Sequence, residues 1–170
     1  MGHPFKRGRG GRLPGTRVLH SDQETHYAWE SVADFAPAPR DGLVEVTARN
    51  VTGRDDTAFG VVCRVSANHG YQLVIFNNGE YGILREGGEG TVGVVLADAR
   101  SSLIPVGAAA YRIGASCVGD QLSLFVNCKK IASIKDKTFV SGSYGLAADT
   151  ISGVHGPREV RFTKFVVRAP

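Results

Sequence analysis

The chain of 170 residues is 42% hydrophobic and 21% charged, which suffices for one domain with its own core and is too short for a large multidomain protein. No run approaches the roughly 18 consecutive apolar residues of a membrane-spanning helix, and no apolar segment of a secretion signal follows Met1. The formal net charge of +4 raises the question of a nucleic-acid partner, whose answer depends on where the basic residues lie.

The basic residues are concentrated at the N-terminus. Residues 1–17 hold five bases and no acid, whereas residues 18–170 hold 15 bases and 16 acids, so the body of the protein is nearly neutral. A folded nucleic-acid-binding face would show as a basic stripe, so we expect no nucleic-acid partner except through residues 1–17. The five glycines of this segment predict a flexible arm, which is either a solvated linker or a contact for another molecule.

After the arm, apolar residues alternate with polar ones in short runs that Gly, Asn and Asp interrupt, as in β-strands. We expect one or two strands between Arg17 and Phe35, and others at residues 43–49, 58–65, 71–76, 81–86, 91–96, 111–118, 121–126, 129–134, 143–148 and 159–167. The stretch 97–110 comes closest to a helical pattern, but a proline and a glycine interrupt it. The spacing predicts an all-β fold, an antiparallel two-sheet sandwich or jelly roll, as a single domain over residues 18–170.

The sequence Phe-Asn-Asn-Gly-Glu-Tyr at 76–81 predicts a β-hairpin. Asn78 and Gly79 lie between two apolar runs, and Asn-Gly favours a two-residue turn of type I′. If the turn has two residues, Phe76 faces Tyr81 on one side of the sheet, and Leu84 lies on the other side.

The three cysteines occur in two contexts. Cys63 and Cys117 lie in the middle of apolar strands and face the core, where they are either two buried thiols or a disulfide. Cys128 follows Asn127 at a hairpin tip where glycine is usual, and a left-handed conformation there costs on the order of 1 kcal/mol. Either this turn has another conformation or the thiol has a use, such as an intermolecular link.

The C-terminal half resembles the laminin G-like group of the concanavalin A-like lectin/glucanase superfamily. That group shows a Gly-Asp turn, a strand ending in Val-Asn-Gly, a strand with Val/Ile-Ala, an Asp before a Phe, a Gly and a Gly-Leu strand. The corresponding residues are Gly119, Asp120, Val126, Asn127, Ile131, Ala132, Asp136, Phe139, Gly142, Gly145 and Leu146, and Cys128 replaces the usual glycine. The resemblance covers roughly residues 40–168.

This resemblance implies a concanavalin A-like jelly roll with one concave sheet. Because the related modules often carry cysteines in these two strands, it also favours a disulfide between Cys63 and Cys117. It points to an extracellular or cell-surface location, although the sequence shows no export signal. Related modules bind carbohydrate or protein ligands on the concave sheet or on the rim loops.

Sugar-binding sites commonly combine an aromatic ring with planar polar side chains. The candidate ligand-binding residues are Trp29, Arg64, Tyr81, Arg85 and Arg112. Each of them also has a simpler interpretation as a core residue or an outward-facing surface residue. Carbohydrate or a glycoprotein is the partner that we expect.

Calcium is the one cofactor that the resemblance suggests, because laminin G-like modules often hold this ion at a sheet rim. Asn50, Asp55 and Asp56 lie in one loop and Asp149 follows the Gly-Leu strand, so these four residues are the candidate ligands. The simpler interpretation, turn formation and solvation, suits these residue types better. The histidines are scattered without the spacing of a zinc site.

A catalytic pair is not visible in the sequence. Glucanases of the superfamily carry Glu-x-Asp-x-Glu on one strand, and no such triplet occurs here. We therefore expect a non-catalytic recognition module for carbohydrate or a surface glycan. The alternative is a structural subunit that self-assembles through residues 1–17, and a sugar hydrolase or lyase is the third possibility.

Overall fold

A computed structural model describes residues 10–12, 15–21, 27–31, 38–66, 69–87, 93–150 and 156–170. These residues form strands, turns and loops without any helix, so the all-β expectation is confirmed. Accordingly, the described part of the chain offers no helix that could span a membrane.

The strands follow the predicted order. They are β1 (Gly10–Arg12), β2 (Thr16–Ser21), β3 (Tyr27–Ser31), β4 (Gly42–Asn50), β5 (Thr57–Ser66), β6 (His69–Phe76), β7 (Glu80–Glu86), β8 (Val94–Arg100), β9 (Tyr111–Val118), β10 (Gln121–Val126), β11 (Lys129–Lys135), β12 (Ser143–Thr150) and β13 (Arg158–Arg168). Apart from β8, the bounds of the strands expected after residue 40 coincide with the sequence expectation or differ from it by one or two residues. The strand expected at 91–96 is displaced, and the stretch after Arg100 is a loop rather than a helix.

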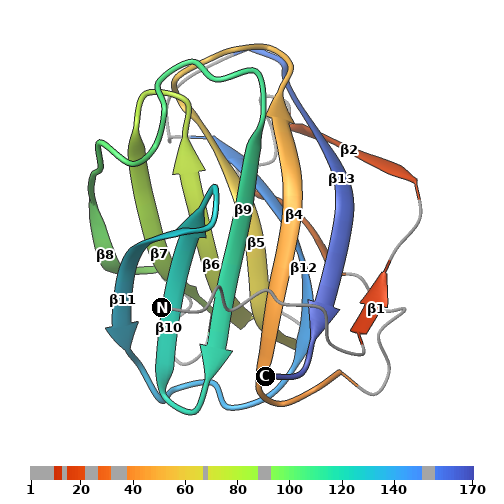
Figure 1. The fold of residues 1–170 in the computed structure, drawn as a ribbon, viewed down its shortest axis with the longest axis vertical. Coiled ribbons are helices and arrows are strands. Elements are labelled where there is room, and N and C mark those ends of the chain that lie inside the picture. The colour runs from red at the N-terminus through yellow and green to blue at the C-terminus, as the bar shows by residue number, and fades with distance from the viewer. Residues whose placement is uncertain are drawn as a thin grey trace.

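The strands form two antiparallel sheets that pack face to face, so the predicted sandwich is confirmed (Figure 1). The front sheet in this view has the order β1-β13-β4-β9-β10-β11, and β2 also pairs with β13. The back sheet has the order β3-β12-β5-β6-β7-β8. Both sheets join strands that are far apart in the sequence, because β13 and β12 each return beside an early strand.

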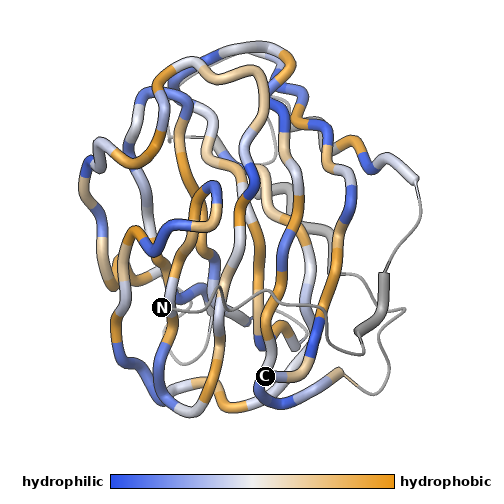
Figure 2. Tube along the Cα trace, in the orientation of Figure 1, coloured by the Kyte–Doolittle hydropathy of each residue, from blue (hydrophilic) through white to orange (hydrophobic). Residues whose placement is uncertain are grey.

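The core lies between the sheets. Hydropathy alternates along β4 of the front sheet (Figure 2), as expected for a strand with one face toward the core. On β4, for example, Val44, Val46 and Ala48 are completely buried. Cys63 of β5 and Cys117 of β9 are also completely buried and form a disulfide that joins the two sheets. The structure thus decides between the two thiol interpretations in favour of the bridge.

Part of the expected arm belongs to the front sheet. Gly10–Arg12 pairs with the end of β13, and Thr16 and Arg17 pair with its middle. These residues of the arm therefore have partners within the same sheet. Residues 1–9, which include Lys6, and residues 13 and 14 lie outside the described part of the chain.

The β6–β7 hairpin has a three-residue loop, so the predicted register is wrong by one residue. Gly79 has a positive φ of 93° and donates its N–H to the carbonyl of Phe76 at 3.2 Å. Tyr81 consequently pairs with Ile75 rather than with Phe76. Since side chains alternate, this shift puts Tyr81 on the core side and Leu84 on the same outer face as Phe76.

The β10–β11 hairpin has the two-residue loop that the sequence suggested. Asn127 and Cys128 have φ values of 48° and 71°, the positive pair that a type I′ turn requires. Asn127 supports the turn because its Oδ1 accepts the backbone N–H of Arg112 at 3.0 Å. Cys128 therefore does occupy a strained position, at an exposed end of the sandwich.

Candidate functional site

The outer face of the back sheet carries an apolar cluster of its own. It consists of Ala58, Val62, Val65, Val74 and Ala147, with Phe76 and Leu84 packed against them. Val62 is completely buried although it points away from the core between the sheets. Because the five residues are buried, only Phe76 and Leu84, which are partly exposed, can offer an apolar surface to a ligand.

A hollow of about 350 Å³ opens on this face along β7 and β8. It is lined by Phe76, Glu80, Tyr81, Gly82, Leu84, Val95, Asp98, Ala99 and Arg100. The register explains why these residues meet. Gly82 pairs with Asp98, and Glu80 pairs with Arg100, so their side-chain positions share one face.

Gly82 makes room for the hollow. A Cβ atom on this residue would lie 3.1 Å from Cδ1 of Leu84 and 3.7 Å from Cγ2 of Val74. A side chain could therefore be placed there if the flexible end of Leu84 moved slightly, and it would fill the space above the strand. The glycine in the middle of β7 thus determines how deep the hollow is.

The charged groups of the hollow are fixed to one another. Arg100 Nη2 donates to Glu80 Oε1 at 2.9 Å, and Asn78 Nδ2 donates to Glu80 Oε2 at 3.0 Å. These hydrogen bonds, that of Arg100 first, lower the pKa of Glu80. The carboxylate therefore stays ionised in mildly acidic solution, as an acceptor whose position is set.

The hollow can bind a small polyhydroxylated molecule. Phe76 and Leu84 supply an apolar surface, and the carboxylates of Glu80 and Asp98 accept hydrogen bonds at the edge. Arg100 retains further N–H groups, since one of its nitrogens is used by Glu80. An apolar floor with a few convergent polar groups is the usual composition of a ligand site.

Two of the sequence candidates lie close to this face. Tyr81 borders the hollow but packs against the core between the sheets. Trp29 pairs with Ala147, whose side chain belongs to the outer apolar cluster. The side chain of Trp29 itself lies outside the part of the structure that is described.

Arg85 lies on the core side of β7 and ties it to the loop after β11. Its Nη1 donates to Asp136 Oδ2 at 2.8 Å and to Thr138 Oγ1 at 2.7 Å. The hydroxyl of Tyr71 donates to the other oxygen of Asp136 and accepts the backbone N–H of Phe139. Arg85 is thus used inside the fold, away from the hollow.

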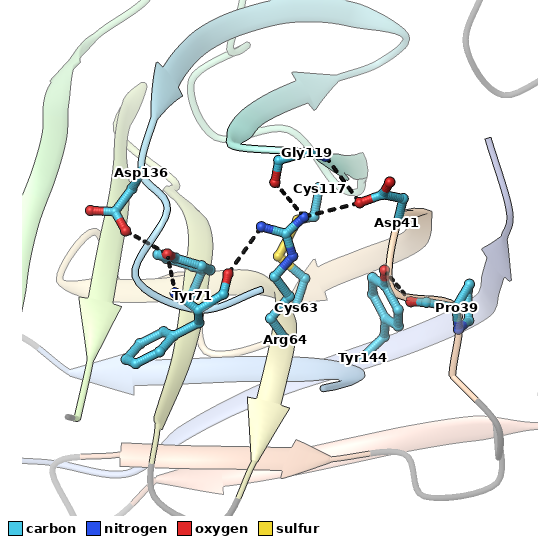
Figure 3. The surroundings of a disulfide bond; sticks show 10 residues. Pro39, Asp41, Cys63, Arg64, Tyr71, Cys117, Gly119, Asp136 and Tyr144 are labelled. Carbon is cyan, nitrogen blue, oxygen red and sulfur yellow. Dashed lines mark hydrogen bonds and ion pairs between the residues drawn. A yellow bond between two sulfur atoms is a disulfide. The ribbon is translucent and has the colours of Figure 1, made fainter. Parts of the chain in front are cut away.

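Arg64 has a structural role beside the disulfide (Figure 3). It lies at a bulge of β5 with φ of 55°, and its side chain is only 1% exposed. The guanidinium donates to the carbonyls of Phe139 and Gly119 at 3.0 and 2.7 Å and to Asp41 at 3.2 Å. It thereby connects β5 with three loops, and little of it is accessible to a ligand.

Arg112 lies on the front sheet, so it does not join the hollow. Its Nη2 pairs with Glu45 at 2.7 Å, and its Nη1 is 3.2 Å from Sγ of Cys128. The hydrogen bond that Arg112 donates to Glu45 is the main cause that raises the pKa of Arg112. The five candidate residues are therefore distributed over both sheets and do not form one site.

The candidate calcium ligands are mostly engaged with protein groups. Asp56 accepts hydrogen bonds from Arg54 and from Arg158. Asn50 Oδ1 accepts from Thr52 and from the backbone of Gly53.

The described residues contain no group of three or more His, Cys, Asp or Glu placed to hold a metal ion. Asp149 pairs with Ala58 across the back sheet, whereas Asp55 is an exposed residue of the β4–β5 loop. Calcium binding at these four residues stays a prediction.

Sequence reasoning missed the polar residues of the hollow, Glu80, Asp98 and Arg100. Each of them alone is an ordinary charged residue on a strand. The signal that could have found them is the glycine at position 82, because a glycine inside a strand often marks a close approach of another molecule. Using that signal required the correct hairpin register.

No protein-family model matches this chain, and no curated protein matches its sequence. Among solved structures, the chain is similar to the carbohydrate-binding module CBM66 from Bacillus subtilis, with a TM-score of 0.63 and 17% identity over 98% of this chain and 100% of that chain. It is also similar to a botulinum neurotoxin type C structure (TM-score 0.56, 13% identity, 94% of this chain and 41% of that chain). A third similar structure is the GH43 BlXynB protein from Bacillus licheniformis (TM-score 0.58, 14% identity, 78% of this chain and 28% of that chain). At these identities the similarity shows the fold alone.

Proposed function

We propose that this protein is a non-catalytic carbohydrate-binding module and that its ligand binds in the hollow on the outer face of the back sheet. The observation that carries the proposal is the composition of the hollow. An apolar floor that includes Phe76 and Leu84 adjoins the ion pair of Glu80 and Arg100 and the carboxylate of Asp98. A sugar presents the matching chemistry, because its ring has an apolar face and its hydroxyls donate and accept hydrogen bonds.

The similar structures support this proposal through what their names state. The Bacillus subtilis structure is a carbohydrate-binding module, and the two proteins cover nearly the whole of each other. Cell entry of the type C neurotoxin depends on interaction with two ganglioside molecules. The names of both proteins thus refer to glycans or to glycolipids.

The residues of the hollow are better suited to binding a sugar than to hydrolysing it. Glu80 and Asp98 share a face at diagonal positions of neighbouring strands, so two carboxylates do lie near each other. A glycosidase needs one of its carboxyl groups to be protonated, which requires a raised pKa. The pKa of Glu80 is instead lowered by Arg100 and Asn78, as suits a permanent hydrogen-bond acceptor.

The laminin G-like relationship remains part of the proposal. Asp136 holds the loop that contains Phe139 through its bonds with Tyr71 and Thr138, which gives the Asp-to-Phe pattern a structural reason. Gly142 has φ of 142°, and a Cβ there would lie 2.4 Å from the backbone carbon of Arg64. These positions support the resemblance through the requirements of the fold.

The disulfide supports a location in an oxidising compartment, because such bonds are rare in the reducing cytosol. Assembly into a larger structure through residues 1–17 stays an alternative prediction. The residues of that segment in β1 and β2 pair with β13 of the same chain. This pairing does not involve a second copy of the protein.

A glycan array followed by isothermal titration calorimetry tests the proposal. Gly82→Val should weaken binding of an array-positive glycan by about tenfold or more, because the new side chain fills the hollow while valine favours a strand. Ser116→Val on β9 of the front sheet is the matched control and should leave binding unchanged.

If Gly82→Val does not fold, Arg100→Ala supplies the same test on an exposed side chain. The proposal is wrong if no glycan binds, or if a bound glycan ignores every substitution in the hollow. If the protein hydrolyses an oligosaccharide of a test panel and Glu80→Gln abolishes that hydrolysis, the protein is a hydrolase rather than a binding module.

A further inference from the structure

The described residues that line the hollow carry a negative net charge. Among them, Glu80 and Asp98 are acidic and Arg100 is the only base. Glu80 is 41% exposed and Arg100 is 65% exposed, so these groups are within reach of a ligand at the edge of the hollow.

The positive charge of Arg100 is already neutralised. Its guanidinium is held by Glu80 at 2.9 Å, and Asn78 fixes the other carboxylate oxygen of Glu80 at 3.0 Å. A ligand carboxylate usually binds to Arg through two parallel hydrogen bonds. Here an incoming carboxylate would have to displace Glu80 from Arg100, or else approach with the charge of Asp98 uncompensated.

The surrounding face extends the same sign of charge. Alternation along β7 places Glu86 on the same face as Gly82, and the register of β12 places Asp149 beside Ala58 of the outer apolar cluster. The described strand residues of this face therefore include four acids and one base. We expect these acids to disfavour the approach of an anion at low ionic strength.

From these charges we propose that the hollow selects neutral glycans and excludes those that carry a carboxylate, such as sialylated or uronic-acid-containing sugars. The inference rests on the proposed function and adds the ligand class. Neutral hydroxyls donate to Glu80 and Asp98 and accept from Arg100 without disturbing the ion pair. A ligand carboxylate finds the charge of Arg100 already paired with Glu80, and it is repelled by the carboxylates of Glu80 and Asp98. This repulsion discriminates against acidic glycans.

The test compares glycans with their acidic counterparts on the whole chain. An array should present neutral oligosaccharides beside the same sugars after sialylation or with uronic acids, and the best pair should then be titrated by calorimetry. Lactose and 3′-sialyllactose are one such pair. We expect the acidic member of each bound pair to bind about tenfold more weakly or worse at low salt, with a smaller ratio at high salt.

The outcomes separate this inference from the proposed function. Equal or tighter binding of the acidic members overturns the charge selection and leaves carbohydrate binding intact. Binding of no glycan at all overturns both.

A charge substitution locates the effect. Asp98→Asn should raise the affinity for the acidic member relative to the neutral one by severalfold, because it removes one of the two anions. Asp120→Asn, at the exposed turn between β9 and β10, is the matched control and should leave the ratio unchanged. If Asp98→Asn loses all binding, Glu80→Gln provides the second measurement of the ratio. An unchanged ratio in both hollow variants means that the selection arises elsewhere and overturns the inference.

Discussion

Cys63 of the back sheet is bonded to Cys117 of the front sheet, 54 residues further along the chain. Arg64, the next residue after Cys63, donates to the carbonyl of Gly119, two residues after Cys117 (Figure 3). The two sheets are thus joined at one end by a covalent bond and by a buried guanidinium. This end of the sandwich lies away from the charged residues of the hollow, so it can support the fold without contributing to binding.

Removing the disulfide should destabilise the fold strongly. Closing a loop of this length stabilises a protein by about 4 kcal/mol in the chain-entropy account. Cys63→Ala with Cys117→Ala should therefore lower the free energy of unfolding by roughly that amount in urea titrations. Cys128→Ser is the control and should change it little. Equal stability of the oxidised and reduced wild-type protein would contradict this expectation.

Asp56 should be needed for stability at neutral pH and not in strong acid. Hydrogen bonds from Arg54 and the buried Arg158 lower its pKa to about 2. Because its folded pKa is below the ordinary value of 3.8, the stabilisation is complete above that value and is lost as the pH falls toward 2.

We expect Asp56→Asn to cost about 2–3 kcal/mol at pH 7, because the side chain of Arg158 is only 1% exposed and loses its carboxylate. Arg54→Ala, which removes a partner that is 37% exposed, should cost clearly less than Asp56→Asn. Chemical unfolding between pH 2 and 7 measures both. A constant difference between Asp56→Asn and wild type over that range would show that Asp56 is not the titrating group.

Replacing Cys128 with glycine should stabilise the protein. Cys128 has φ of 71°, a conformation in which a Cβ atom is crowded by the backbone. Glycine has no Cβ atom and adopts this conformation without strain. Cys128→Gly should therefore raise the free energy of unfolding by about 0.5–1 kcal/mol despite losing the contact of its sulfur with Arg112. Cys128→Ala keeps the Cβ atom and serves as the control. The explanation by backbone strain fails if the glycine variant is no more stable than the alanine variant.

The fold was predictable because its strands alternate over several residues and end at clear turns. The positions of Cys63 and Cys117 in apolar strands left a disulfide and two buried thiols both open, and only the laminin G-like resemblance favoured the bridge. Local sequence patterns did not predict which strands distant in sequence pair with each other, such as β12 with β5. Pairing of this kind depends on the packing of the whole core.

The hollow was not predictable because its position depends on one loop residue. Asn78 and Gly79 suggested a two-residue turn, whereas Asn77 also belongs to the loop. That difference exchanges the two faces of β7 and places Tyr81 opposite Ile75 on the core side, not on the same side of the sheet as Phe76. Arg85 was expected at the surface, yet it is bound to Asp136 of a loop 51 residues away. The local sequence predicts neither the position of Tyr81 nor the contact of Arg85 with Asp136.

Glycan binding should be lost in acid at a pH that Arg100 controls. The carboxylate of Glu80 accepts hydrogen bonds only while it is ionised, and Arg100 is the main cause of its lowered pKa. Affinity should therefore persist below the ordinary glutamate value of 4.5 and then fall as the pH drops through the lowered pKa.

In Arg100→Ala the pKa of Glu80 returns toward its ordinary value, so the residual binding should decline at a higher pH than in wild type. Arg161→Ala removes a comparable arginine, bonded to Glu159 at 2.7 Å on the front sheet, and should leave the pH profile unchanged. Calorimetry between pH 7 and 3.5 gives the affinities, and circular dichroism confirms that each variant stays folded. Identical midpoints for Arg100→Ala and wild type would show that Glu80 does not contact the ligand, because the variant changes the ionisation of that carboxylate and leaves the apolar floor of Phe76 and Leu84 in place.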